Sequence, residues 1–454
     1  MPAIDDFGTW EPLLKLLRAN GAVGPAAAGG RTTGRITAGG GFSLRLGPHA
    51  DVMDQMSAVK PVAKALDEAG RKDIAFEVEI RPSGRAALHL INADGAVDSG
   101  VGPYPGALVL VDGAVPEPWR RPPEAVPDAA PAASADPGLL ERTLRERLPK
   151  AIGATTAEIA AAEERLGIAL PDELKALYRV TRAHWDDHKD DYEAMDREVR
   201  AVGLELFPPD EVYIADAASR HCSWRFGGLE AAVTPPDAEV QGLVGSPGWI
   251  VFGDNGGGDR IAVDLTPGPR GHLGQIIILS HEESVGAALI ADSLTDLVVN
   301  RRKDFDPEPL GDRSRAVAHV NVRSLPSVRA AAHPDLEVLS IGAWDDEPVG
   351  LAPVVGLPRL RTLSAYPGTL ADPLEIPRLT GLEFLALGPD EWRVLLDAGA
   401  VPRGLLAADI VVHGDPSPLP IVALANEILA LWDRPRIGTT VIEGDLGRDV
   451  VGSP

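Results

Sequence analysis

The chain has 454 residues, and its 67 Asp and Glu against 43 Lys and Arg give a formal net charge of −24 at pH 7. A chain of this length exceeds one ordinary hydrophobic core, so we expect about two to four domains. The acidic excess disfavours nucleic acid and anionic membranes as partners, because binding their phosphates requires clustered Lys and Arg, and it favours basic protein partners.

The first residues, MPAIDDFGTWEPL, carry acidic side chains where a signal peptide has a basic start and an apolar core. The sequence shows no run of about 20 apolar residues. Its single cysteine, Cys222, allows no internal disulfide. Together these features predict a cytoplasmic protein.

Residues 1–121 predict a small α+β domain of unknown function. TWEPLLKLLRAN and residues 50–69 carry apolar side chains at helical spacing. IAFEVEI alternates apolar and polar residues, RPSG turns the chain and RAALHLI returns, which predicts a β-hairpin; ALVLVDG predicts a further strand. The stretch GGRTTGRITAGGG is rich in glycine but lacks the spacing and the lysine of a phosphate-binding loop.

Two segments have compositions typical of linkers. Residues 122–137, PPEAVPDAAPAASADP, are rich in Pro and Ala and show no apolar period that could bury a face. Residues 303–315 are charged and interrupted by proline. The sequence thus predicts a multidomain α+β protein with a central domain at 138–302 and a C-terminal domain at 316–454.

In the central domain, predicted helices precede predicted strands. Thr155 and Glu158 have the spacing of a capping box, and Gly167 would end that helix. LPDELKALYRV restarts a helix with Pro171 near its beginning, and an acidic segment, DDHKDDYEAMDREVR, follows. GWIVFG, DRIAVDL and GQIIILSHE predict three antiparallel strands, and we expect a last helix to hold Val285, Leu289, Leu294 and Leu297.

The C-terminal domain contains an internal repeat. The pattern apolar-x-x-apolar-x-apolar begins at Val317, Leu336, Leu360, Leu382 and, more weakly, Leu405, so that successive copies are 19, 24, 22 and 23 residues apart. This period resembles a degenerate leucine-rich repeat, although the asparagine that usually follows each strand is missing. The pattern predicts a solenoid in which each unit buries its apolar face against its neighbour, with the helix IVALANEILALW as a cap.

The stretch GDNGGGDRIAVDL, residues 253–265, admits three interpretations. Asp254, Asn255 and Asp259 could contribute to a calcium loop, but the closing Glu is absent. A phosphate loop would continue with Lys and then Ser or Thr, where Asp and Arg stand here. Because Asn and Gly tolerate positive φ, we favour a tight turn between two strands. Asp254 is then expected to bond loop amides, and Asp264 to tie the strand end to a neighbouring loop.

Other polar pairs are weaker candidates for chemistry. His184 and His188 would share a helical face in HWDDH, but a zinc protease requires Glu where Trp185 stands. Ser280 and His281 are adjacent in an expected strand, so their side chains would point to opposite faces. We therefore expect no catalytic residue, no cofactor and no bound metal.

Four blocks follow one another in a characteristic order: TTAEIAAAEERLGIALPDELKALYRV, GWIVFGDNGGGDRIAVDL, IIILSHE and IADSLTDLVVN. Together they resemble the SUKH superfamily, which includes bacterial immunity proteins and fungal cell-wall-synthesis regulators of the Smi-Knr type. The resemblance covers about a third of the chain. The positions that match the family motifs, as structural or partner-binding residues, are Leu170, Pro171, Tyr178, Trp249, Gly253, Asp254, Gly258, Asp264, His281 and Ser293.

This resemblance implies a mainly antiparallel sheet with helices and a non-enzymatic, protein-binding role. The main interpretation is an immunity protein that neutralises a basic bacterial toxin domain by binding and occlusion. The alternative is a regulatory scaffold or adaptor for cell-wall synthesis or signalling proteins. Trp224 is one candidate anchor, since aromatic residues often dominate binding. An acidic insertion that departs from the family pattern supplies further candidate partner contacts, namely Trp185, Asp186, Asp187, Asp190 and Asp191.

Overall fold

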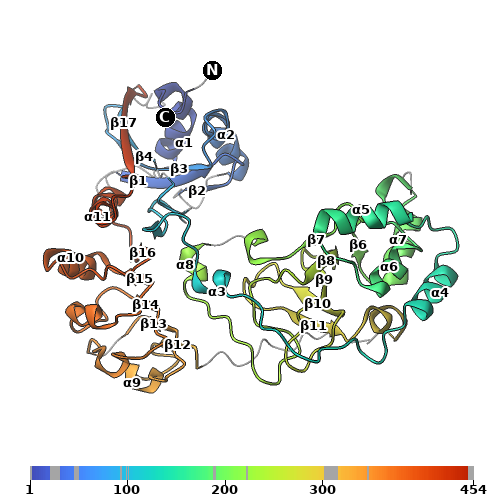
Figure 1. Cartoon of the computed structure of the whole chain (residues 1–454). Helices are drawn as coiled ribbons and strands as arrows, with labels where there is room; N and C mark the ends of the chain where they lie inside the picture. The colour runs from blue at the N-terminus through green and yellow to red at the C-terminus, as the bar shows by residue number, and fades with distance from the viewer. Residues whose placement is uncertain are drawn as a thin grey trace. The chain divides into compact units, whose positions relative to one another are not determined.

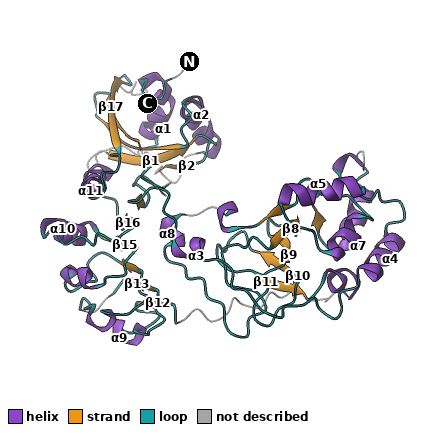
Figure 2. Ribbon diagram, in the orientation of Figure 1, coloured by secondary structure: helices purple, strands orange, loops and turns teal. Residues whose placement is uncertain are grey.

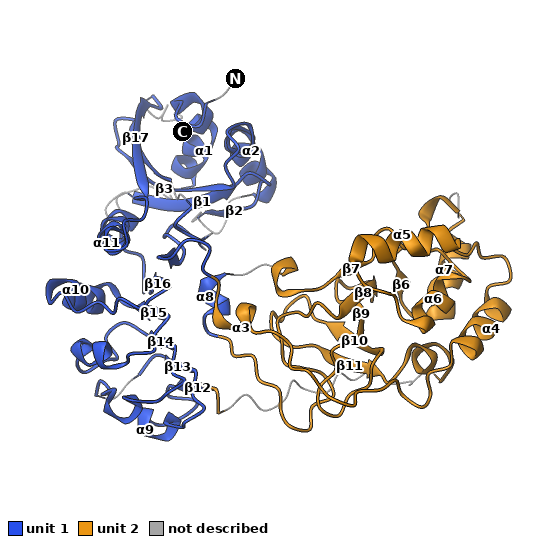
Figure 3. Cartoon of the chain, in the orientation of Figure 1, with its two compact units in different colours: residues 1–114, 223–229, 318–454 blue, residues 115–222, 230–317 orange. Residues whose placement is uncertain are grey.

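The computed structural model describes residues 3–20, 31–44, 51–92, 95–98, 100, 102–187, 191–220, 223–300, 315–344 and 347–447. Figure 1 follows the chain through its elements, and Figure 2 distinguishes helices from strands. Two compact units are distinguished in Figure 3: unit 1 comprises Met1–Ala114, Ser223–Leu229 and Ala318–Pro454, and unit 2 comprises Val115–Cys222 and Glu230–Val317. Both units are therefore built from segments that are distant in the sequence.

The first part of unit 1 packs two helices against an antiparallel sheet. The helices, α1 (Phe7–Ala19) and α2 (Val52–Glu68), share a buried cluster with the sheet. The strand order is β17–β4–β3–β1–β2. These strands are β1 (Arg31–Thr37), β2 (Phe42–Leu44), β3 (Asp73–Ile80), β4 (Arg85–Asn92) and β17 (Gly438–Asp445). The two predicted helices and the hairpin of β3 and β4 are confirmed.

Strand β1 comes from the glycine-rich stretch, for which no element was predicted. It pairs with both β2 and β3. At Gly34 a Cβ atom would come within 2.8 Å of the Phe76 ring and within 2.8 Å of the Ser43 carbonyl oxygen. Glycine is needed there because the neighbouring strands leave no room for a side chain.

Strand β17 brings the C-terminal part of the chain into the N-terminal sheet. It pairs antiparallel with β4 over the whole span from Gly438 opposite Asn92 to Asp445 opposite Arg85. The predicted domains 1–121 and 316–454 therefore do not coincide with unit 1, which contains residues of both. Pairing between such distant strands leaves no local signal in either segment.

The second sheet of unit 1 has the strand order β12–β13–β14–β15–β16–β5. Strands β13 to β16 run parallel, and β5 pairs antiparallel with β16. The strands are β12 (Val317–Val320), β13 (Val338–Ile341), β14 (Thr362–Ala365), β15 (Phe384–Leu387), β16 (Ala407–Ile410) and β5 (Leu108–Val109). The helices that accompany them are α8 (Trp224–Gly227), α9 (Val328–Ala331), α10 (Pro389–Asp397) and α11 (Pro418–Ala430).

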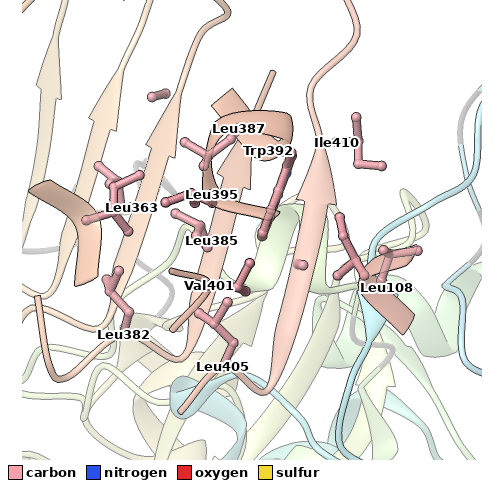
Figure 4. Packing of buried hydrophobic residues seen from close by; sticks show 14 of the residues in the cluster. Leu108, Leu363, Leu382, Leu385, Leu387, Trp392, Leu395, Val401, Leu405 and Ile410 are labelled. Carbon is pink, nitrogen blue, oxygen red and sulfur yellow. The ribbon is translucent and has the colours of Figure 1, made fainter. Parts of the chain in front are cut away.

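The parallel strands coincide with the copies of the predicted repeat. Leu363, Leu385 and Leu387 point from neighbouring strands into one buried cluster, which Figure 4 shows together with Trp392 and Leu395 of α10. The first copy departs from the pattern, because β12 ends before its last apolar position and leaves that valine, Val322, 59% exposed. The likeness to leucine-rich repeats remains a prediction.

Unit 2 places helices against a second antiparallel sheet. The strand order is β11–β10–β9–β8–β6, and β7 also pairs with β8. The strands are β6 (Glu205–Leu206), β7 (Tyr213–Ile214), β8 (Trp249–Asp254), β9 (Arg260–Asp264), β10 (Gln275–Leu279) and β11 (Ala288–Ala291). The helices are α3 (Glu117–Arg120), α4 (Pro137–Arg147), α5 (Thr156–Leu166), α6 (Asp172–Tyr178) and α7 (Tyr192–Val202). The three predicted antiparallel strands, β8 to β10, are confirmed.

Apolar side chains cover both faces of the unit 2 sheet. Ile250 and Phe252 join the cluster formed with α4, α5, α6 and α7, whereas Trp249 and Val251 join a separate cluster on the other face. Burial on both faces explains why these strands are continuous apolar runs. Helix α5 has the predicted capping box and ends at Gly167 with φ +70°. Among the described residues, no helix combines the length and the apolar character needed to cross a membrane.

Two other expectations for this region need correction. The predicted last helix is correct only in its second half: Leu289 lies in strand β11 on the edge of β10, whereas Leu294 and Leu297 lie in the helical residues 294–300, which include the π-helix Asp296–Asn300. Residues 122–137, predicted to be a linker, are held along unit 2, where the Glu124 amide donates to the Gln241 side chain at 2.8 Å. The predicted linker 303–315 lies almost wholly outside the described residues.

Truncation of the chain after residue 435 tests the pairing of β17 with β4. Without β17, the backbone groups of β4 that face it lose their partners, and Ile442 no longer covers the helix-backed core. We expect the amides of Arg85–Asn92 to exchange hydrogen at least about tenfold faster, while the sheet of unit 2 keeps its protection. A chain truncated after Gly447 is the matched control and should exchange as the full chain does. Unchanged protection of β4 in the shorter chain would refute the pairing.

Candidate functional site

The glycine loop of unit 2 connects β8 to β9 as a hydrogen-bonded turn. The Gly256 amide donates to Asp254 Oδ1 at 2.7 Å, and the Gly257 amide donates to Asn255 Oδ1 at 2.8 Å. Gly256 and Gly258 have φ +76° and +103°, which side chains rarely tolerate. Since the loop's own side chains engage these amides, the loop is built as a turn and does not present them as a phosphate cradle.

Charged side chains on this hairpin pair with one another. Arg260 Nη1 donates to Asp254 Oδ2 at 2.6 Å. His281 follows β10, outside the strand in which it was expected, and its Nδ1 lies 2.7 Å from Asp259 Oδ1. The hydrogen bond from the His281 amide is the main reason why the pKa of Asp259 is lowered. The predicted role of Asp254 as an acceptor from loop amides is confirmed.

Asp264 is fully buried at the end of β9. Its Oδ1 accepts from the Thr266 amide at 2.7 Å, and its Oδ2 accepts from Gln275 Nε2 at 2.9 Å. Burial raises the pKa of Asp264 to about 6, against the lowering effect of these hydrogen bonds. The carboxylate ties its strand to the loop that follows and to β10, as the sequence predicts.

Other motif positions lie in the framework of unit 2. Leu170, Tyr178 and Trp249 are buried. The Tyr178 hydroxyl donates to the Phe207 carbonyl oxygen at 2.9 Å, which anchors α6 to the segment after β6. Pro171 occupies the position just before α6. The three buried residues shape the fold and present little surface to a partner, whereas Pro171 is half-buried.

The last motif residues serve turns and close contacts. At Gly253 a Cβ atom would come within 2.4 Å of the Glu205 carbonyl oxygen, so glycine allows β6 to approach β8. Ser293 Oγ accepts from the Asp296 amide at 3.0 Å and so supports the helical turn after β11. The structure does not gather the ten motif positions into one surface site, and a partner-binding role for any of them remains a prediction.

The acidic insertion presents an exposed aromatic pair. Trp185 and Tyr192 are 54% and 67% exposed, and their ring centroids lie 6.3 Å apart in an edge-to-face arrangement. Asp186 is exposed beside them, and Asp191 caps α7 by accepting from the Ala194 amide at 3.0 Å. We call residues 185–187 together with residues 191–196 the aromatic–acidic surface. Tyr192 was not predicted, although an aromatic residue one acidic run away from Trp185 was the available signal.

A charged network holds this surface in place. Arg182 donates to both carboxylate oxygens of Asp187, each at 2.7 Å, and its Nη1 donates to Glu158 at 3.0 Å. Glu158 also completes the capping box of α5, so the network connects the insertion to a regular helix. The Asp187 carboxylate therefore has a structural role, because it is bonded to Arg182, whereas the Asp186 side chain is exposed.

Several predicted residues of this segment, and Cys222 outside it, either lie outside the described residues or have no metal-binding partners among them. Asp190 and His188 lie outside the described residues, and so does Cys222. His184 Nε2 lies 3.6 Å from Asp210 Oδ1. Across the described parts of the chain, no three or more His, Cys, Asp or Glu side chains gather as metal ligands would.

The raised pKa of Asp264 predicts that the stability of the fold depends on pH, and Asp264→Asn should remove this dependence. Because folding raises this pKa, the stabilisation is present at low pH and is lost as the pH rises through about 6. We expect the stability advantage of the wild type over Asp264→Asn to shrink by about 2 kcal/mol between ~pH 4.5 and ~pH 7.5, measured by urea unfolding of both full chains. An advantage independent of pH would contradict the burial argument. An unchanged melting temperature with lost partner binding would contradict the structural role.

Part of the sequence of unit 2 is similar to known proteins. Residues 153–300 match the model of the SMI1 / KNR4 family (SUKH-1). Over 67 residues the chain is 40% identical to a glucan synthesis regulatory protein of Neurospora crassa, covering 15% of this chain and 13% of that protein. Over 148 residues it is 27% identical to the cell wall biosynthesis/cell cycle regulator smi1 of Schizosaccharomyces pombe, covering 29% of this chain and 27% of that protein.

The chain spans only about an eighth to about a quarter of the length of these relatives. The matched segment runs from the residues just before α5 to the π-helical turn, and it includes the glycine hairpin and the aromatic–acidic surface. The predicted SUKH resemblance is thereby confirmed. Residues 153–300 of this chain form a SMI1/KNR4 (SUKH-1) domain.

Proposed function

We propose that the chain is a non-enzymatic regulatory adaptor whose SMI1/KNR4 domain binds a protein partner. The observation that carries this proposal is the aromatic–acidic surface, which lies inside the family domain. Two relatives are named as regulators of glucan synthesis or of cell wall biosynthesis and the cell cycle. Their names favour the regulatory interpretation over neutralisation of a bacterial toxin.

The surface has the composition of a binding anchor. Large aromatic side chains at an interface often supply most of the binding energy. Trp185 and Tyr192 are largely exposed, while neighbouring Asp186, Glu193 and Asp196 are exposed and acidic. Carboxylates around aromatic anchors attract a basic partner and speed the encounter. We therefore infer a partner segment with Lys or Arg around an apolar centre.

The chemistry of the hairpin supports a role without catalysis. Asp254 and Asp259 pair with Arg260 and His281, and the loop amides bond to side chains of the loop. Asp264 is buried and satisfied by hydrogen bonds. These carboxylates thus have structural partners within the hairpin and the neighbouring strands.

The double substitution Trp185→Ala/Tyr192→Ala tests the proposed surface. With the full chain as bait in a lysate of the source organism, we expect the principal partner to be retained at least about tenfold less by the double variant, because the anchors are lost. Leu139→Ala, which removes an exposed apolar side chain of α4 in the same unit, is the matched control and should retain it. Equal retention by the double variant would refute the surface. A cell-wall-synthesis or signalling protein as the partner supports regulation, whereas a toxin domain would support immunity.

Salt separates the electrostatic part of this binding from the apolar part. With the purified partner, we expect the association rate to fall several-fold between ~0.05 M and ~0.3 M NaCl, because screening shortens the reach of the acidic side chains. Asp186→Asn should reduce the salt dependence without abolishing binding. Stopped-flow fluorescence measures both. A rate that does not change with salt would contradict a basic partner.

A further inference from the structure

The parallel sheet of unit 1 has two different faces. Alternate residues of its strands, such as Leu385 and Ile410, point into the large apolar core. The residues that alternate with these along each strand point to the opposite face. They include Phe384 of β15 and Ala407 and Asp409 of β16. Residues 223–229, which include the short helix α8, lie against this second face.

Trp224 fills the apolar part of this face. It is only 3% exposed, and its ring centroid lies 5.7 Å from that of Phe384. Its indole nitrogen donates to the Ala114 carbonyl oxygen at 3.0 Å, and its amide donates to Asp98 Oδ2 at 2.8 Å. The expectation that Trp224 could be an exposed anchor is wrong, because the sheet of unit 1 buries it.

Arg225 and Gly228 complete a specific fit. Arg225 donates to both carboxylate oxygens of Asp409, at 2.8 and 2.7 Å. The Gly228 carbonyl oxygen accepts from Thr362 Oγ1 at 2.8 Å, and a Cβ at Gly228 would come within 2.6 Å of the Phe384 ring. Each contact selects a different property of the segment: an aromatic ring, a guanidinium and a residue without a side chain.

These contacts resemble recognition of a peptide more than ordinary core packing. The Asp409 side chain is only 7% exposed, so it requires a cation that can bond both oxygens. Phe226, between the recognised residues, is 62% exposed and contributes no buried contact. A segment that merely covered the sheet would need no buried ion pair.

We propose that this face is a peptide-binding site that the chain fills in cis with residues 223–229. A partner segment with an aromatic residue, an arginine directly after it and a glycine three residues further on competes for the same contacts. Because the cis segment is tethered, its effective concentration is on the order of millimolar, so the partner binds fully only when the segment is displaced. This site lies in unit 1, although residues 223–229 fall within the range that the family model matches, and it shares no residue with the aromatic–acidic surface.

A labelled peptide with the sequence of residues 223–229, SWRFGGL, tests the proposal by fluorescence anisotropy. The full chain carrying Trp224→Ala/Arg225→Ala should bind the peptide at least about tenfold more tightly than the wild type, because its own segment no longer competes. Adding Asp409→Asn to that variant should abolish the gain. A peptide with Glu in place of the arginine should not bind either chain.

Two controls keep the result interpretable. Arg393→Ala breaks another two-bond ion pair of unit 1, between Arg393 and Glu427 at 2.7 and 3.0 Å, and should not create peptide binding. Arg225→Lys keeps the charge and Trp224, so it tests the site if the double variant fails to fold. The affinity of the Arg225→Lys chain for the peptide should lie between that of the wild type and that of the double variant. Folded Arg225→Lys or double-variant chains that bind no better than the wild type would overturn the proposal. So would tight binding that is indifferent to Asp409 or to the arginine of the peptide.

Discussion

A strand at the edge of a sheet exposes amides and carbonyls that need partners, and in unit 1 these partners come from the far end of the sequence. β17 pairs with the whole of β4, and β5 pairs with β16. Each of the two sheets therefore contains strands from both the N-terminal and the C-terminal parts of the chain. Neither part closes its sheets alone, and the sheet face that holds Trp224 and Arg225 depends on this exchange.

The sequence was informative wherever the cause of an element lies within a few residues of it. The capping box at Thr155, the hairpin of β3 and β4, and the parallel strands at repeated spacing all have such local causes. It failed where the cause lies elsewhere. Residues 288–291 match a helical period, yet they form a strand because β10 offers them an edge. The pairing of β17 and the hydrogen bonds that hold residues 122–137 along unit 2 have no local pattern at all.

The candidate site shows the same division. The roles of Asp254 and Asp264 could be predicted, because Asp next to Gly in a turn, or at a strand end, bonds nearby amides. Which tryptophan is exposed could not be predicted. Trp185 and Trp224 both lie near polar residues, but burial depends on tertiary neighbours, and the ring that covers Trp224 belongs to Phe384, 160 residues away (384 − 224).

The aromatic–acidic surface and the sheet face that holds Trp224 both combine tryptophan with carboxylates. In the first surface these side chains are exposed and in the second they are buried, so the carboxylates have different effects. Around Trp185 the exposed carboxylates Asp186 and Glu193 are in water, where they act at a distance and are screened by salt, so they affect the rate of encounter more than its geometry. Asp409 is shielded from water, so it discriminates at contact between a guanidinium that bonds both oxygens and an ammonium that cannot. The proposed adaptor needs both properties. In these two proposals the exposed surface attracts basic partners, whereas the buried carboxylate admits only a segment that replaces Arg225 with equal geometry.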